Sequence, residues 1–188
     1  RKFCLTIIVL AGFSKALFAQ FGNCTASEMQ TYTDRETGNT ITILTDTLKN
    51  DRFLYQTDPM WTHDGKYLLF RSSSRANDKK IERTLPNGEK RSWTPTQIYF
   101  IEMATGQIIQ ATEGPDLGSA FLANKSNRMF ISRKEKEDWN MYVMDLDKFF
   151  ADVKKGKVGK PTAYETLLGT FPTSMGRPGG YAIDCNDD

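Results

Sequence analysis

The sequence predicts an all-β fold: a β-propeller of four-stranded antiparallel blades, incomplete, with about two to three blades present. The first observation is a repeat of strand, polar turn and strand. The first copy covers residues 58–75 with 97–112, and the second covers residues 119–132 with 140–146. Composition is the second, since 39% hydrophobic and 26% charged residues indicate a globular chain. An aromatic content of 12% suits the packing of sheets.

Turn signals bound the predicted strands of both repeats. Asp64-Gly65 is a strong hairpin signal between Met60-Trp61 and an apolar strand at residues 67–70. Ser126-Asn127 holds the same place in the second repeat. The first repeat is longer, because it carries an insert at residues 76–96. Pro, Asn and Gly residues in that insert predict a long loop or a small hairpin on one rim of the propeller.

A further strand signal precedes the first repeat. Thr37-Gly38 is a turn that leads into an alternating strand ending at Thr45, and residues 105–112 carry its echo. In a propeller this segment would be the outer strand of a blade. Because it precedes any full repeat, we expect it to complete a blade formed by distant C-terminal residues, which closes the ring and protects its edges.

The C-terminal third continues the pattern with mixed signals. Residues 145–153 suit a helical turn, and residues 154–160 form a basic, Gly-broken loop that fits either a docking patch for an acidic polymer or a solvated connection. Residues 161–166 predict an outer strand. A tight loop at 176–180 leads into a new strand at 181–185. We therefore expect residues 20–188 to be the N-terminal part of a longer propeller domain.

Residues 1–19 have the order of a secretory signal peptide: a basic start, a short apolar run and a small residue before Gln20. A buried N-terminal strand or helix is the alternative. Export to the periplasm or the extracellular space would permit a disulfide between Cys24 and Cys185, although two unpaired thiols fit equally well. We expect no membrane attachment after cleavage. The near-neutral remainder of the chain gives no electrostatic footprint for nucleic acid.

Two short motifs are the most specific in the chain: the Tyr55-Gln56 pair before the first repeat and the sequence Ala-Thr-Glu-Gly at residues 111–114 after it. With them go Thr37-Gly38 with Leu44-Thr45, and residues 62–70, 98–102, 121–122 and 142–146. Through these stretches residues 34–188 resemble the N-terminal part of the oligogalacturonate lyases. The insert at 76–96 and the loop at 177–180 depart from the family pattern.

The resemblance implies a seven-bladed propeller that cleaves pectic oligogalacturonides by β-elimination. It also implies a manganese-type divalent metal held by His and Gln side chains, with a histidine as the base. His63 is the single histidine of this chain, and its place before Asp64-Gly65 favours a structural turn residue. We therefore assign no catalytic residue and no metal ligand to these 188 residues, and the oligomeric state stays open.

Four arginines are candidate ligands for the carboxylates of an acidic oligosaccharide. Arg71 and Arg75 follow one apolar strand, and Arg133 follows the equivalent strand of the next repeat. Arg177 lies in the Gly-rich loop near the C-terminus. Guanidinium groups at matching ends of adjacent blades could converge on a uronate carboxylate by bidentate pairing. The alternative interpretation is that they are rim charges that face water.

Three tryptophans could stack on sugar rings. We expect Trp61 to pack between blades, and Trp93 and Trp139 to be the exposed candidates. Two other functions stay open, because an Asp-Gly-Lys turn before an apolar strand also marks other propellers. One is a non-enzymatic interaction module of the TolB type, and the other is the propeller domain of a secreted serine peptidase.

Overall fold

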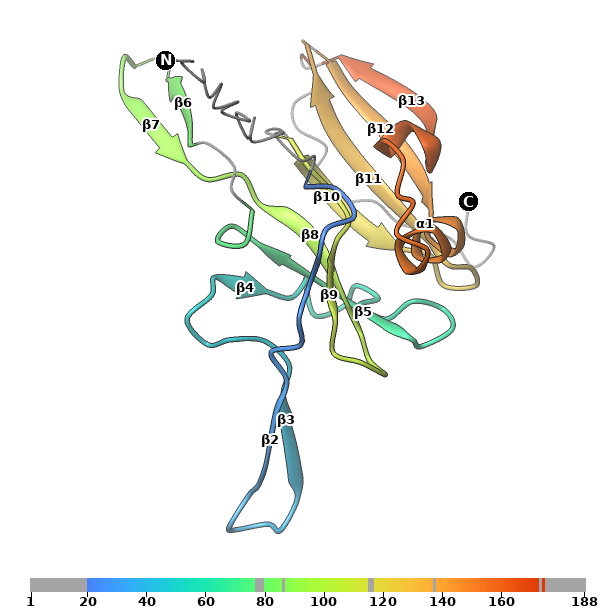
Figure 1. Cartoon of the computed structure of the whole chain (residues 1–188). Helices are drawn as coiled ribbons and strands as arrows, with labels where there is room; N and C mark the ends of the chain where they lie inside the picture. The colour runs from blue at the N-terminus through green and yellow to red at the C-terminus, as the bar shows by residue number, and fades with distance from the viewer. Residues whose placement is uncertain are drawn as a thin grey trace, which may run out of the picture.

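The computed structural model describes residues 20–76, 80–85, 87–114, 117–136, 138–172 and 174. These residues form four antiparallel sheets, two of them blade-like and two of them isolated hairpins (Figure 1). This arrangement confirms the predicted all-β, incomplete propeller. None of the described helices is long and apolar enough to cross a membrane.

The first blade has the strand order β4-β5-β8-β9-β1. Its bounds are β4 (Asp51–Arg52), β5 (Tyr67–Ser72), β8 (Gln97–Glu102), β9 (Ile108–Gln110) and β1 (Cys24–Thr25). The second blade has the order β10-β11-β12-β13, in which chain order and spatial order agree. Its bounds are β10 (Leu117–Leu122), β11 (Arg128–Glu135), β12 (Asp138–Asp145) and β13 (Glu165–Pro172).

The predicted Asp64-Gly65 turn forms as expected. Trp61 bridges to Leu68, and the amide of Thr62 donates to the carbonyl of Tyr67 at 3.0 Å. Gly65 has φ 69, a left-handed conformation that costs glycine little. The buried Thr62 hydroxyl donates to the Asp64 carboxylate at 2.8 Å, which fixes the turn from inside.

The two blades pack face to face on one hydrophobic core. Alternate residues of the central strands point into it, as the period of a strand requires. The buried apolar residues come from both blades and from helix α1 (Leu146–Lys154): Phe21, Tyr67, Leu69, Ile98, Phe100, Ile109, Ala111, Ala120, Leu122, Met129, Ile131, Met144, Leu146, Phe149, Phe150 and Tyr164. The packing of neighbouring blades is thus what buries the apolar face of each.

The helical turn predicted at residues 145–153 forms as the nine-residue helix α1, which closes one end of the core. The side chain of Asp145 caps it by accepting from the amide of Lys148 at 2.9 Å. Phe150 stacks on Tyr67 with ring centroids 3.6 Å apart and meets Phe100 edge-on at 5.1 Å. The basic loop follows α1, and at its start Lys154 pairs with Glu102 at 2.8 Å.

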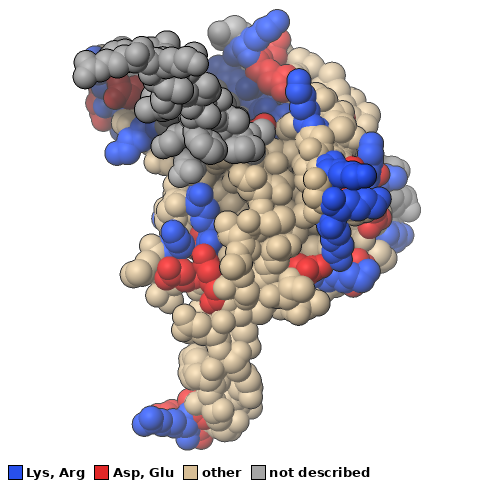
Figure 2. All heavy atoms as spheres, viewed as in Figure 1, with Lys and Arg blue, Asp and Glu red and all other residues tan. Residues whose placement is uncertain are grey.

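Two hairpins stand outside the blades. Strands β6 (Ile81–Thr84) and β7 (Lys90–Trp93) form the small hairpin predicted for the insert, and its turn has Gly88 at φ 82. Strands β2 (Gln30–Thr33) and β3 (Thr40–Ile43) form a second hairpin that projects from the body, with charged residues at its tip (Figure 2).

Strand β3 is the segment that we expected to be an outer blade strand. Among the described residues it pairs only with β2, and Tyr32 and Ile41 of this hairpin are exposed. The N-terminal strand that joins a blade is instead β1, which pairs with β9. Completion of a blade by C-terminal residues stays a prediction.

The end of the chain differs from expectation in one respect. Residues Pro161–Ala163 form a 3-10 turn, so the outer strand β13 begins only at Glu165. Pro161 has no amide hydrogen to donate to a ladder, which favours a turn here. The predicted signal peptide at 1–19, the loop at 176–180 and the strand at 181–185 lie outside the described residues.

Candidate functional site

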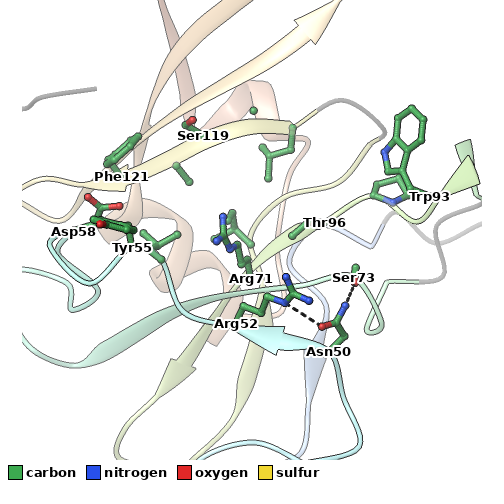
Figure 3. Close-up of a pocket in the computed structure, with 16 residues that line it drawn as sticks. Asn50, Arg52, Tyr55, Asp58, Arg71, Ser73, Trp93, Thr96, Ser119 and Phe121 are labelled. Carbon is green, nitrogen blue, oxygen red and sulfur yellow. Dashed lines mark hydrogen bonds between the residues drawn. The ribbon is translucent and has the colours of Figure 1, made fainter. Parts of the chain in front are cut away.

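A pocket of about 730 Å³ opens between the edge strands β4 and β10 of the two blades (Figure 3). These strands hold the same edge position in their sheets, and in a propeller that edge faces the central channel. The lining residues come from four segments of the chain: Asn50, Arg52, Leu54, Tyr55, Asp58, Arg71, Ser73, Trp93, Pro95, Thr96, Ile98, Leu117, Gly118, Ser119, Ala120 and Phe121.

Two arginines lie side by side in this pocket (Figure 3). Arg71 lies on β5 two residues beyond Leu69, so its side chain continues the face that packs against the second blade. Its register partner on β4 is Arg52, so both side chains lie on one face of the sheet. Like charges directly opposite each other are destabilising, and an anion bound between them would relieve that repulsion.

Polar contacts hold Arg52 in place without neutralising it. Its Nε donates to the Asn50 side-chain oxygen at 3.2 Å, and the Asn50 amide donates to Ser73 at 2.6 Å (Figure 3). Within the described part of the chain, neither Arg52 nor Arg71 forms an ion pair with a carboxylate. The pocket therefore presents two exposed guanidinium groups to a ligand.

Arg75 lies on the other face of the first blade. Its guanidinium donates to both carboxylate oxygens of Asp51 and of Glu28, with the Arg75 Nη2 atom 2.6 Å from the nearer Glu28 oxygen. The Arg75 hydrogen bonds lower the pKa of Glu28 to about 2. Arg75 also lies 5.3 Å from the ring centre of Phe70, so it fastens the segment around Glu28 over this face.

Arg133 is engaged in a similar way on the second blade. Its two Nη atoms donate to Glu165 at 3.0 and 2.8 Å, and the Glu165 side chain is 1% exposed. Burial disfavours the charge on Arg133, but the Glu165 hydrogen bonds outweigh this and raise its pKa. Both Arg75 and Arg133 are paired with carboxylates of this chain. Their role as ligands of a substrate carboxylate stays a prediction. Arg177 lies outside the described residues.

His63 ties the two blades together. Its Nδ1 lies 2.9 Å from the carbonyl of Asn124, and the amide of Asp64 donates to Asn127 at 3.3 Å. The Asp64-Gly65 turn of the first blade is therefore hydrogen-bonded to the turn at residues 124–127 of the second blade. The described residues contain no group of three His, Cys, Asp or Glu side chains that could hold a metal, so they do not fit a manganese site.

The tryptophans differ from expectation at two positions. Trp61 is 47% exposed rather than packed between the blades, and Trp139 is 8% exposed rather than open to solvent. Trp139 covers Gly118, where an added Cβ would lie 2.9 Å from the indole ring. Trp93 is 37% exposed, as expected, and it lines the pocket. Both corrections follow from strand pairing: Trp139 pairs with Lys134 and packs over Gly118 on the face of the second blade that lies away from the shared core, whereas Trp61 lies at an isolated bridge.

No protein-family model and no curated protein sequence matches this chain. Its fold is similar to a solved oligogalacturonate lyase in complex with manganese, with a TM-score of 0.50 and 22% sequence identity. That match covers 70% of this chain and 30% of the lyase chain. A second similar structure is the oligogalacturonate lyase from Vibrio parahaemolyticus, with 23% identity, a TM-score of 0.49, and coverage of 69% and 29%.

The fold and the first of these matches define the class: a β-propeller, present in part, with the fold of an oligogalacturonate lyase. The first of these solved structures is an oligogalacturonate lyase, which agrees with the resemblance found in the sequence. At this identity the likeness concerns the fold, and the chain spans less than a third of the length of those lyases.

Proposed function

We propose that the pocket between β4 and β10 binds oligogalacturonides, and that the whole protein cleaves them by β-elimination. The neighbouring guanidinium groups of Arg52 and Arg71 carry this proposal, because a galacturonate oligomer presents one carboxylate on every ring. A planar guanidinium binds a carboxylate through two parallel hydrogen bonds. The similarity in fold to oligogalacturonate lyases supports the same ligand class.

The chemistry explains why arginines suit the site. β-Elimination removes the proton at C5 of a uronate, and the glycosidic oxygen leaves from C4. Negative charge develops on the carboxylate as the C5 proton is removed, and cationic groups placed beside it stabilise that state. The electron pair then forms the C4–C5 double bond as the C4–oxygen bond breaks, and the departing oxygen takes up a proton. The part played by Arg52 and Arg71 is to hold and neutralise the carboxylate, whereas we place the base and the metal outside the described residues.

Replacing Arg71 with alanine should weaken the binding of trigalacturonate. Loss of a charged hydrogen-bonded contact costs about 1.5–3 kcal/mol, so the affinity should fall about tenfold or more. Isothermal titration calorimetry on the wild-type and variant proteins measures this.

The matched control is Arg35→Ala, because Arg35 is an exposed arginine in the turn of the β2–β3 hairpin, outside the pocket. It should bind trigalacturonate as the wild-type protein does. No binding by the wild-type protein, or equal losses in both variants, would remove the oligosaccharide assignment and leave the interaction-module alternative.

We also propose that the protein is exported, on the order of basic, apolar and small residues at 1–19. Secretion by the native host should release a chain that begins at Gln20. N-terminal sequencing of the secreted protein tests this, and retention of residues 1–19 in the mature protein would contradict it.

A further inference from the structure

The inserted hairpin brings an aromatic side chain to the pocket. Trp93 is the last residue of β7 and pairs in register with Ile81, so the hairpin fixes its backbone. Pro95 and Thr96, which follow it toward β8, also line the pocket. The C-terminal end of the insert, next to β8, therefore forms one wall of the site.

Aromatic and cationic groups are separated along the pocket. In the view of Figure 3, Trp93 stands at one end, Tyr55 and Phe121 stand at the other, and Arg71 and Arg52 lie between them. Tyr55 is 67% exposed and Trp93 is 37% exposed, so both present ring surface to solvent. This distribution suits an extended ligand that is anionic along its length and has faces that can stack.

A galacturonate oligomer is such a ligand. Its carboxylates match the guanidinium groups, and the C–H face of each ring can lie on an aromatic surface, since aromatic side chains combine an apolar body with a large contact area. A volume of about 730 Å³ falls within the usual range for ligand pockets and exceeds what a single sugar ring needs. A monomer would engage the arginines, whereas a longer oligomer would also reach Trp93.

We propose that Trp93 forms an outer sugar-stacking subsite at the insert end of the pocket, which makes binding selective for longer oligomers. This inference rests on the proposed function. It assigns the subsite to Trp93, which lies in the insert that departs from the family pattern.

The test compares two ligands on the same variants. Trp93→Ala should lower the affinity for trigalacturonate by about tenfold, while the affinity for monomeric galacturonate should change by less than about twofold. Trp93→Phe keeps an aromatic face and should recover most of the trigalacturonate affinity. Isothermal titration calorimetry gives both constants.

Arg91→Ala is the matched control for damage to the hairpin. Arg91 lies on β7 and pairs with Glu89 at the surface, outside the pocket, so its loss should leave both affinities unchanged. Trigalacturonate binding that depends on Arg71 but not on Trp93 would overturn the subsite alone. Equal losses of affinity for galacturonate and trigalacturonate in Trp93→Ala would also overturn the subsite. No trigalacturonate binding by the wild-type protein would overturn both the subsite and the proposed function.

Discussion

Replacing Phe149 with alanine is expected to lower the free energy of unfolding by about 4 kcal/mol, which is a large part of the stability of a typical domain. The Phe149 side chain is 0% exposed and lies where the first blade, the second blade and α1 meet. Its ring centre is 5.0 Å from that of Phe21 and 5.5 Å from that of Tyr164. The substitution removes the ring and leaves a cavity that three packed elements cannot easily close.

Urea denaturation followed by circular dichroism measures this loss. Leu168→Ala is the control, because Leu168 is a half-exposed apolar residue on β13 and should cost less than about 1 kcal/mol. If the free energy of unfolding falls by the same small amount in both variants, the blades do not share the core that the structure describes.

Replacing Arg75 with alanine is expected to lower the free energy of unfolding by about 3 kcal/mol near neutral pH. The Arg75 side chain is 7% exposed and binds two carboxylates, of which Asp51 is itself largely buried. Removing the guanidinium leaves Asp51 charged, buried and unpaired, and it also frees the segment around Glu28.

The effect of Arg75 should depend on pH in a defined direction. Arg75 holds the pKa of Glu28 at about 2, below its ordinary value of 4.5. A lowered pKa in the folded state means that the stabilisation is present above pH 4.5 and is lost as the pH falls toward 2. The gap between wild-type and variant stability should therefore narrow across this interval.

Denaturation curves at a series of pH values measure that gap. Arg91→Ala removes an ion pair that is exposed on both sides, so it should change stability by less than about 1 kcal/mol at every pH. A gap for Arg75→Ala that stays constant down to pH 2 would contradict the assigned cause of the Glu28 shift.

The blades could be predicted from the sequence because their signals are local. Asp64-Gly65 specifies a tight turn, and the apolar runs on either side specify paired strands. The hairpin of the insert follows from Pro, Asn and Gly in the same way. Trp139 and Trp61 were predicted wrongly because their burial depends on non-local pairing. Gly118, which leaves room for Trp139, lies two strands away in the second blade.

The pocket could be predicted only in part. Arg71 was identified because it follows an apolar strand. Arg52 was not, because β4 has two residues and no alternating pattern to mark it as a strand. Its place opposite Arg71 depends on the register between β4 and β5, which becomes visible only in the folded chain. The ion pairs of Arg75 and Arg133 depend on carboxylates distant in sequence, at Glu28 and Glu165.

A crystal structure of this protein with trigalacturonate is the most direct measurement. We predict a uronate carboxylate between β4 and β10, with its oxygens about 2.7–2.9 Å from the guanidinium nitrogens of Arg71. Trigalacturonate bound at another surface, or an empty pocket at saturating ligand, would contradict the assignment of this pocket to acidic oligosaccharides.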